Sequence, residues 1–243
     1  YGNVYPGAQI PFGGIQISPD TDSRFYDAAS GYKYNHLTLM GFSLTHLSGT
    51  GIPDLGDFLF IPGTGEMKLE PGTHEDPDQG YRSRYSHDKE WASPNYYAVE
   101  LADYGVKAEM TSGVRSGMFR FIYPESDNAF IMIDMNHTLW QSCEWSNLRM
   151  INDSTITGYK LVKGWGPERH VYFTATFSKK LTGLRFVQDK KPVIYNTSRF
   201  RSSYEAWGKN LMACISFDTK AGEEVTVKTA ISAVSTDGAR NNM

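Results

Sequence analysis

From residue 95 onward, apolar and polar side chains alternate along short runs, and turn residues separate one run from the next. Alternation of this kind places apolar side chains on one face of a strand and polar side chains on the other. A series of such runs is typical of a sandwich or a barrel. We therefore predict strands at Tyr96–Leu101, Val106–Thr111, Ser116–Ile122, Ala129–Met135, Thr155–Val162, His170–Phe177, Leu184–Val187, Leu211–Phe217 and Val225–Ala233.

The run from Arg169 to Phe177 shows the alternation most clearly. Its apolar face carries Val171, Phe173, Ala175 and Phe177. Its polar face carries His170, Thr174 and Thr176. Helical periodicity is almost absent, and the one short turn of helix that we predict lies within Ser203–Met212. The pattern as a whole predicts an all-β protein, a large antiparallel β-sandwich.

The first 80 residues follow a different pattern, dense in Gly, Pro, Asp, Ser and Thr, with short apolar islands at Ile15–Ile17 and Phe58–Ile61. Long, ordered, polar loops of this kind often carry function. At the other end, Ser232–Met243 turns polar after a strong strand, so either the domain ends there or a linker begins. We expect a single domain over residues 1–243.

Composition and charge narrow the class of protein. The chain is 40% hydrophobic and 21% charged, which is typical of a folded globular domain. Its net charge is −3 and no Lys/Arg run occurs, so we expect no nucleic-acid partner. No stretch approaches the ~18 consecutive apolar residues of a membrane-spanning segment. The first residues lack a signal-peptide layout, and we expect the chain to begin inside a longer gene product.

The cysteines and histidines show no spacing that is typical of a zinc site. Cys143 and Cys214 permit at most one disulfide, and two separate buried thiols are the favoured interpretation. Asp20, Asp22 and Asp27 could supply oxygens to a hard cation such as calcium. Their spacing lacks the Gly and the terminal Glu of an EF-hand, however, and it favours Asx turns.

The segment Gly41–Asp57 is the strongest candidate for ligand binding. It combines hydroxyls, an imidazole, two carboxylates and several glycines, a mixture that suits a neutral polyol. His46 lies among its polar residues and is a candidate ligand contact, with a structural histidine as the alternative. The segment is neither a Walker loop nor a GxGxxG turn, and a tight loop with local side-chain bonds remains an alternative to binding.

Aromatic residues make up 14% of the chain, and their rings suit either the core of a sandwich or stacking against sugars. Glycoside hydrolysis needs a pair of carboxyl groups at a set separation, which a sequence cannot show. Glu66 and Glu144 are the glutamates that suggest such a role, and neither has a convincing context. No Gly-x-Ser-x-Gly nucleophile turn occurs, although Leu47–Gly49 faintly imitates one.

Several segments match the pattern of a known family in order along the chain. They are Tyr5–Ala8, Pro11–Gly13, Ser18–Thr21, Ser30–Tyr34, Gly41–Asp57, Arg169–Phe173, Phe177–Lys179 and Ser235–Arg240. The most specific is Thr45–Gly51, which reads Thr-His-Leu-Ser-Gly-Thr-Gly. On these residues the chain resembles glycoside hydrolase family 92.

The resemblance implies a galactose-mutarotase-like supersandwich that forms the N-terminal part of a longer, two-domain enzyme. It implies a calcium-dependent, inverting exo-α-mannosidase that removes terminal α-linked mannose from glycans, N-glycans among them, with α-1,2 as a candidate linkage. A bacterial enzyme that is periplasmic or extracellular, or held at the cell surface, would fit. Its partners would be mannose-containing glycans and its own C-terminal (α/α)6 catalytic domain, which is absent from this chain.

The resemblance also assigns roles to residues. The catalytic acid and base and most calcium ligands are expected in the absent domain, so this fragment should be inactive alone, and we assign no catalytic or metal-binding residue within it. Side chains and backbone groups that are expected to face the substrate pocket are Tyr26, Asp27, His46, Ser48, Gly49 and Thr50.

The chain departs from the family pattern at the segment that usually reads Trp-Asp-Gly-Cys-Ser-Gly-Tyr. Here Tyr26 replaces the Trp and Ala28 replaces a Gly. In the separate segment Gly41–Asp57, Ile52 stands where a cysteine is common. These changes put the linkage preference, and mannose itself, in question. Two alternatives remain: an autonomous carbohydrate-binding module without hydrolytic activity, and a structural sandwich that only shields a catalytic domain.

Overall fold

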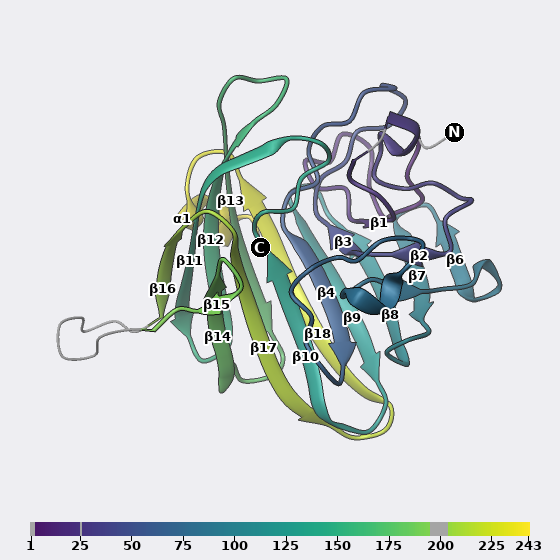
Figure 1. Ribbon diagram of the computed structural model, residues 1–243. Coiled ribbons are helices and arrows are strands. Elements are labelled where there is room, and N and C mark those ends of the chain that lie inside the picture. Colours follow the sequence, from purple (N-terminus) through teal and green to yellow (C-terminus); the bar gives the residue numbers. More distant parts are fainter. Residues whose placement is uncertain (1–2, 25, 195–203) are drawn as a thin grey trace.

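Two antiparallel sheets packed face to face form most of the molecule, as the computed structural model shows (Figure 1). The structure describes residues 3–24, 26–194 and 204–243. The seven-stranded sheet runs in the order β1 (Ser18–Asp20), β3 (Gly41–Ser43), β4 (Leu59–Thr64), β10 (Ser126–Asp134), β17 (Leu211–Thr219), β14 (Gly183–Gln188) and β15 (Lys191–Pro192). All its strand pairings are antiparallel.

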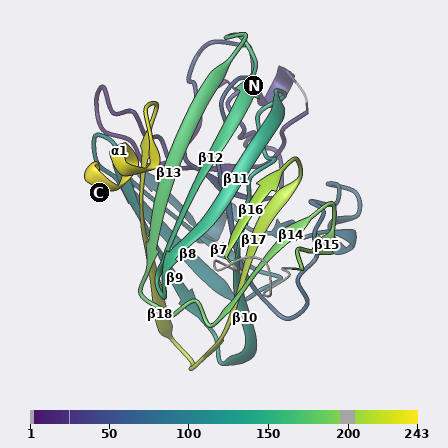
Figure 2. The same cartoon turned by 90° about the vertical axis from the view of Figure 1, so that its left-hand side faces the viewer.

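The second sheet has nine strands and curves around the first (Figure 2). Its order is β16 (Glu205–Gly208), β11 (Ser142–Asn152), β12 (Thr155–Lys163), β13 (Arg169–Phe177), β18 (Glu223–Ser232), β9 (Ser116–Tyr123), β8 (Val106–Ser112), β7 (Tyr96–Leu101) and β6 (Glu90–Ser93). The remaining elements are the pair β2 (Thr38–Leu39) and β5 (Ser83–Arg84), the 3₁₀ turns η1 (Tyr26–Ala28), η2 (Pro77–Gln79) and η3 (His87–Lys89), and the helix α1 (Thr236–Asn241).

The main core lies between the two sheets and is rich in aromatic rings. Phe60 of β4 packs against Phe119 of β9 with ring centroids 4.9 Å apart, and Phe58 meets Phe173 of β13 at 4.5 Å. Alternation along β4 and β10 sends every second side chain to the opposite, outer face of the seven-stranded sheet. There a second apolar cluster includes Leu59, Ile61, Phe130, Met132 and Met212, with Tyr81 and Met67 of the β4–β5 connection packed against it.

The sequence pattern predicted most of this architecture. The all-β antiparallel sandwich is confirmed, and the apolar face of β13 is buried as expected. The prediction of a short helical turn within Ser203–Met212 is wrong for residues 204–212, the part that the structure describes. Those residues form β16 and the start of β17 instead, because Ala206 pairs with Leu148 of β11 and buries its side chain. Ser203 itself lies outside the described residues.

Among the other elements that were not predicted, β11 and α1 have clear physical reasons. Strand β11 has 11 residues, yet register shifts at Cys143/Trp145 and Met150/Asn152 interrupt its alternation, so its sequence does not read as one strand. The polar end of the chain forms α1, in which the Ser235 hydroxyl accepts a hydrogen bond from the Gly238 amide at 2.9 Å.

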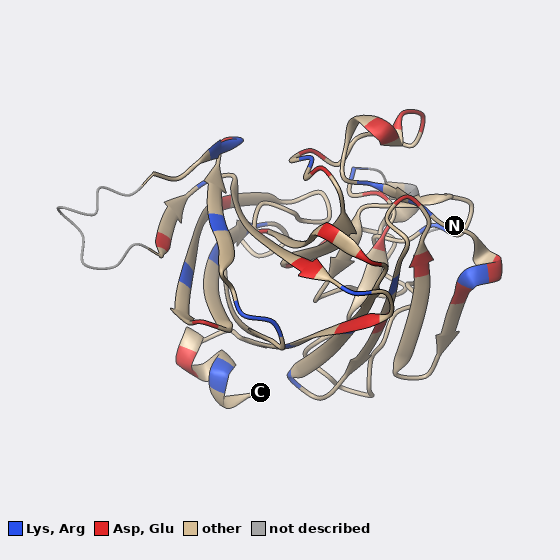
Figure 3. Cartoon of the chain, turned by 90° about the horizontal axis from the view of Figure 1, so that it is seen from below, with Lys and Arg blue, Asp and Glu red and all other residues tan. Residues whose placement is uncertain are grey.

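Charged residues of both signs are interspersed over the molecule (Figure 3). No helix within the described residues is long and apolar enough to span a membrane.

Candidate functional site

Loops that are distant in sequence meet at one end of the sandwich, the upper end in Figure 1. The connection between β10 and β11 binds the connection between β3 and β4 through two hydrogen bonds. The Leu139 amide donates to the Leu55 carbonyl at 2.9 Å, and the Gln141 side-chain amide donates to the Pro53 carbonyl at 2.9 Å. The β10–β11 connection therefore sets the position of the segment that the sequence singled out.

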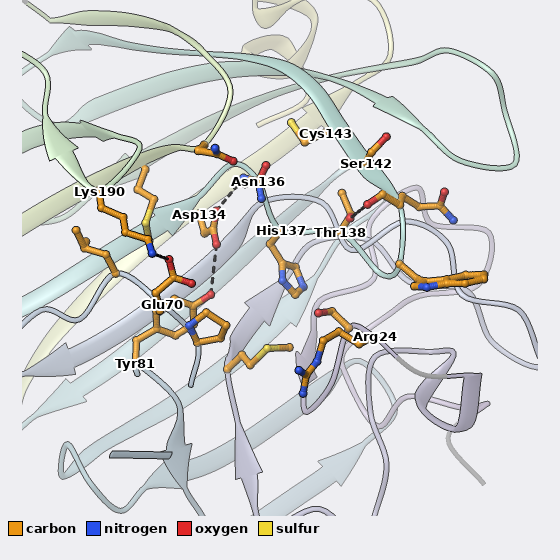
Figure 4. Close-up of a pocket in the computed structure, with 18 of the residues that line it drawn as sticks. Arg24, Glu70, Tyr81, Asp134, Asn136, His137, Thr138, Ser142, Cys143 and Lys190 are labelled. Atoms are coloured by element: carbon orange, nitrogen blue, oxygen red, sulfur yellow. Dashed lines mark hydrogen bonds and ion pairs between the residues drawn. The ribbon is translucent and has the colours of Figure 1, made fainter. Parts of the chain in front are cut away.

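Below these loops, a cavity of about 930 Å³ opens on the outer face of the seven-stranded sheet (Figure 4). This volume lies within the range of small-molecule sites. Most of the residues that line it come from the loop before η1, the β4–β5 connection, the β10–β11 connection and the turns that follow β14 and β16, and the rest come from the ends of neighbouring strands. The lining residues are Ser23, Arg24, Met40, Leu69, Glu70, Pro71, Tyr81, Asp134, Asn136, His137, Thr138, Trp140, Gln141, Ser142, Cys143, Asp189, Lys190, Asn210 and Met212.

Polar groups at the sheet end of the cavity are held in place by their neighbours. Asp134, the last residue of β10, accepts hydrogen bonds from the Tyr81 hydroxyl at 3.3 Å and from the Asn136 amide at 2.8 Å. Burial and the adjacent Asp134 raise the pKa of Tyr81 well above its usual value, so this phenol stays a hydrogen-bond donor. Lys190 and Glu70 form an ion pair at 2.6 Å. The cavity thus offers fixed donors and acceptors rather than one dominant charge.

The loop end of the cavity carries an aromatic pair. The rings of Trp140 and Tyr26 meet edge to face with centroids 4.7 Å apart. About half of each side chain remains exposed, 52% for Trp140 and 53% for Tyr26. Trp140 also adopts a φ of 64°, which is rare for a bulky residue, so the loop holds this ring in place against a local conformational cost.

His137 reaches the cavity from a buried polar network. Its Nε2 lies 2.8 Å from Oδ2 of Asp20, and the other oxygen of Asp20 lies 2.8 Å from Nε2 of His46. Burial raises the pKa of Asp20, but the contacts with His46 and His137 outweigh this effect and lower it below its usual range. Asp20 is therefore a buried carboxylate that joins β1 to the loops on either side.

A second buried network centres on Asp57, the last residue of the segment Gly41–Asp57. Arg169 binds both oxygens of Asp57 at 2.6 and 3.1 Å, and the Thr45 hydroxyl donates to it at 2.7 Å. Lys160 lies 3.2 Å from Asp57 and also donates to the His137 carbonyl at 2.6 Å. Lys160 thereby joins the two networks and ties the loop end to strand β12.

The residues that the resemblance assigned to the pocket do not form one cluster. Tyr26 packs against Trp140 but is not itself among the residues that line the cavity, whereas the side chain of Asp27 lies outside the described part of the structure. The side chain of His46 is fully buried and contacts protein groups. Ser48–Thr50 are exposed on the loop surface and are not among the residues that line the cavity.

The remaining candidates from the sequence have local roles. Asp22 accepts a hydrogen bond from the Arg24 amide at 2.9 Å, which is an Asx turn as favoured. Glu144 pairs with Lys209 at 3.1 Å, and Glu66 is exposed in the β4–β5 connection. Neither glutamate lines the cavity.

Sequence reasoning missed the most prominent cavity residues, His137, Trp140 and Asp134. The available signal was a polar turn that carries an imidazole and an indole between two predicted strands. Only the fold shows that this turn faces Arg24 and Tyr81, which lie far away along the chain.

Among the described residues, no group of three or more His, Cys, Asp or Glu side chains is arranged to hold a metal ion. Asp20 and Asp22 serve separate partners, since Asp20 binds two histidines and Asp22 pairs with Arg24 and His74. Asp20 and Asp22 are therefore not gathered around a shared cation position in the described structure.

Cys143 and Cys214 are both buried and both free. Burial raises the pKa of the Cys214 thiol to about 11, so it stays protonated at neutral pH.

Comparisons with known proteins give one consistent result. The sequence model of the Glycosyl hydrolase family 92 N-terminal domain matches residues 1–232. A solved family GH92 inverting mannosidase from Bacteroides thetaiotaomicron superposes with a TM-score of 0.79 at 24% identity, covering 99% of this chain and 30% of that one. A solved GH92 family glycosyl hydrolase, ccman5, gives 0.80 at 24% identity, covering 99% and 32%. No curated protein matches the sequence significantly. The chain thus spans about a third of the length of these solved relatives.

Proposed function

The chain belongs to the glycosyl hydrolase family 92 N-terminal domain family, and we propose that it is the N-terminal β-sandwich of an exo-α-mannosidase. One solved protein of similar fold is described as an inverting mannosidase. Terminal α-linked mannose of glycans is accordingly the proposed substrate, with α-1,2 as a candidate linkage. A bacterial enzyme that works in the periplasm or outside the cell on N-glycans is the proposed setting.

The observation that carries this proposal for the chain itself is the cavity beneath the Trp140–Tyr26 pair. A pyranose has an apolar face that suits an aromatic ring and a rim of hydroxyls that need both donors and acceptors. The cavity is lined by the half-exposed Trp140 ring, against which Tyr26 packs, together with Asp134, Arg24 and His137. Sites of this composition take small polar ligands in a fixed orientation.

In an inverting glycosidase, one carboxylic acid protonates the leaving oxygen while a carboxylate about 6.5–9.5 Å away activates water. We place both groups in the catalytic domain proposed to follow this chain. The sandwich would orient the sugar with its aromatic pair and its fixed polar groups, and would exclude bulk water from that side. The proposed calcium requirement likewise belongs to the complete enzyme, and we place most of the calcium ligands in the catalytic domain.

Two departures from the family pattern bear on specificity. Tyr26 presents a smaller ring than the usual Trp, and Trp140 lies against its edge, so the two residues share one aromatic surface. Ala28 is buried in the turn η1, where the family has a glycine. We propose that this aromatic pair replaces the single indole of the family pattern in contacting the sugar.

An autonomous carbohydrate-binding module is the second candidate function. The fact that favours it is that described residues of this chain line an open cavity of about 930 Å³ without a second domain. Calorimetry with α-1,2-mannobiose separates the two functions. Millimolar or tighter binding to the chain alone supports the module, whereas binding that requires the full-length enzyme supports a half-site completed by the catalytic domain.

A further inference from the structure

Two imidazole rings share one buried carboxylate beneath the cavity. Oδ1 of Asp20 lies 2.8 Å from Nε2 of His46, and Oδ2 lies 2.8 Å from Nε2 of His137. The side chains of Asp20 and His46 are 0% exposed, and that of His137 is 4% exposed. Water cannot therefore substitute for these contacts, and the positions of the protons must satisfy the protein groups alone.

The neighbours of His46 determine where its protons lie. Its Nδ1 is 2.7 Å from the backbone carbonyl of Gln16, which can only accept a hydrogen bond. Its Nε2 faces the carboxylate of Asp20, which also accepts when ionised. The Ser43 hydroxyl, 3.1 Å from the same Nε2, can donate or accept and so adapts to either state. Both ring nitrogens of His46 therefore have acceptors as partners, which requires a proton on each.

The charge of Asp20 is thus balanced by His46, and His137 need not carry a second positive charge. The same network already contains a buried cation, since the Lys160 ammonium donates to the His137 backbone carbonyl at 2.6 Å. A further buried positive charge on the His137 ring would have no counter-ion of its own, which is unfavourable. His137 is then neutral, with its proton on Nε2 toward Asp20 and a lone pair on Nδ1.

The hydrogen bonds of the described residues reach the His137 ring at Nε2 and not at Nδ1, and this ring lines the cavity (Figure 4). We propose that Asp20 is a positioning residue: with His46 it fixes the tautomer of His137, so that Nδ1 accepts a hydrogen bond from a ligand hydroxyl. The identity of the ligand, a mannoside, rests on the proposed function. The positions of the protons on the two histidines do not depend on it.

The tautomers can be read directly by ¹⁵N NMR of the histidine rings in the full 243-residue chain at neutral pH. The expected spectrum has both nitrogens of His46 protonated, and His137 protonated at Nε2 with an unprotonated Nδ1. A neutral His46, or a His137 protonated at Nδ1, would overturn the positioning role. The variant Asp20→Asn is expected to convert His46 to a neutral ring, and a His46 that stays doubly protonated would also overturn it. The wild-type spectrum decides the point even if this variant does not fold.

The ligand contact is tested with methyl α-D-mannopyranoside in the full-length enzyme, where the proposed half-site is complete. Saturating sugar is expected to shift the Nδ1 resonance of His137 and to leave His46 unchanged. His137→Phe, which keeps a ring but loses the acceptor, is expected to weaken binding about tenfold. Binding without a shift at Nδ1 would overturn the contact. If the tautomers are as expected but the sugar binds neither the chain nor the full-length enzyme, both the ligand contact and the sugar-binding role of the cavity are overturned. Wrong tautomers would instead overturn the positioning role alone.

Discussion

The rings of Tyr26 and Trp140 meet edge to face, with centroids 4.7 Å apart, although the two residues are 114 positions apart in the chain. Tyr26 belongs to the turn η1, and Trp140 belongs to the connection between β10 and β11. The fold thus assembles one aromatic surface from two loops, and this surface borders the cavity that we assign to sugar binding.

Removing the larger ring of this pair should weaken sugar binding with little effect on stability. Trp140→Ala is expected to lower affinity for α-1,2-mannobiose about tenfold, because the sugar loses an apolar contact surface. The free energy of unfolding should change by less than about 1 kcal/mol, since the ring is half exposed. Calorimetry on the full-length enzyme and denaturant unfolding provide the two measurements. The control Trp91→Ala removes an exposed indole of β6 outside the cavity, and it should bind as the wild type does. Equal loss in both variants would contradict the assignment.

Two glycines with positive φ should respond differently to an added methyl group. At Gly49, φ is 77° and a Cβ would meet no atom within 4 Å, so Gly49→Ala should cost only the backbone penalty of about 1–2 kcal/mol. At Gly31, φ is 85° and a Cβ would overlap Oδ1 of buried Asp20. Gly31→Ala should therefore be the more destabilising variant in urea unfolding. Equal losses of stability would show that the Asp20 network can move without cost.

Asp57 should be essential to the loop end of the sandwich. Asp57→Asn leaves the fully buried Lys160 without its ionic partner, and we expect a loss of about 3–5 kcal/mol in the free energy of unfolding. Glu144→Gln is the matched control, because it neutralises a carboxylate whose pair with Lys209 is at the surface, and stability should remain unchanged. A small effect of Asp57→Asn would mean that Lys160 finds another partner.

The same carboxylates predict how stability depends on pH. Burial raises the pKa of Asp57, but Lys160 and Arg169 outweigh this effect and lower it, as the two histidines do for Asp20. The pKa of an Asp in an unfolded chain is about 3.9, which is higher than that of Asp57 or Asp20 in the folded protein. On acidification the unfolded chain therefore binds protons at these carboxylates before the folded protein does. The stabilisation is complete above about pH 5 and should decline steadily as the pH falls below about 4. Urea unfolding between pH 7 and pH 3 measures this decline, which should be shallower in Asp57→Asn. An unchanged slope in that variant would exclude Asp57 as its source.

The sheets could be predicted from the sequence because alternation is a local signal. Strand β7 begins and ends at the residues expected, Tyr96 and Leu101, since every second side chain enters the core. Strand β11 could not be found in this way, because bulges such as that at Cys143/Trp145 shift the phase of alternation within one strand. The strand β16 was read as helix, because pairing with β11 decides its conformation.

The site was less predictable because its contacts are long-range. The family pattern pointed to Tyr26, which packs against the cavity residue Trp140, and to His46, whose fully buried ring contacts Asp20. His137 lies 117 positions from Asp20, and no local spacing relates the two residues. Asp20 and His137 come together only because β1 and β10 lie in the same sheet, with β3 and β4 between them.

The central claim is that this sandwich serves an exo-α-mannosidase, and release of mannose tests it most directly. The full-length protein should liberate free mannose from α-1,2-mannobiose when the products are separated by ion-exchange chromatography, and the 243-residue chain alone should liberate none. Trp140→Ala in the full-length protein should lower kcat/KM about tenfold, while Trp91→Ala should not change it. A full-length protein that releases no mannose from any α-linked mannobiose, or a Trp140→Ala variant as active as the wild type, would contradict the account.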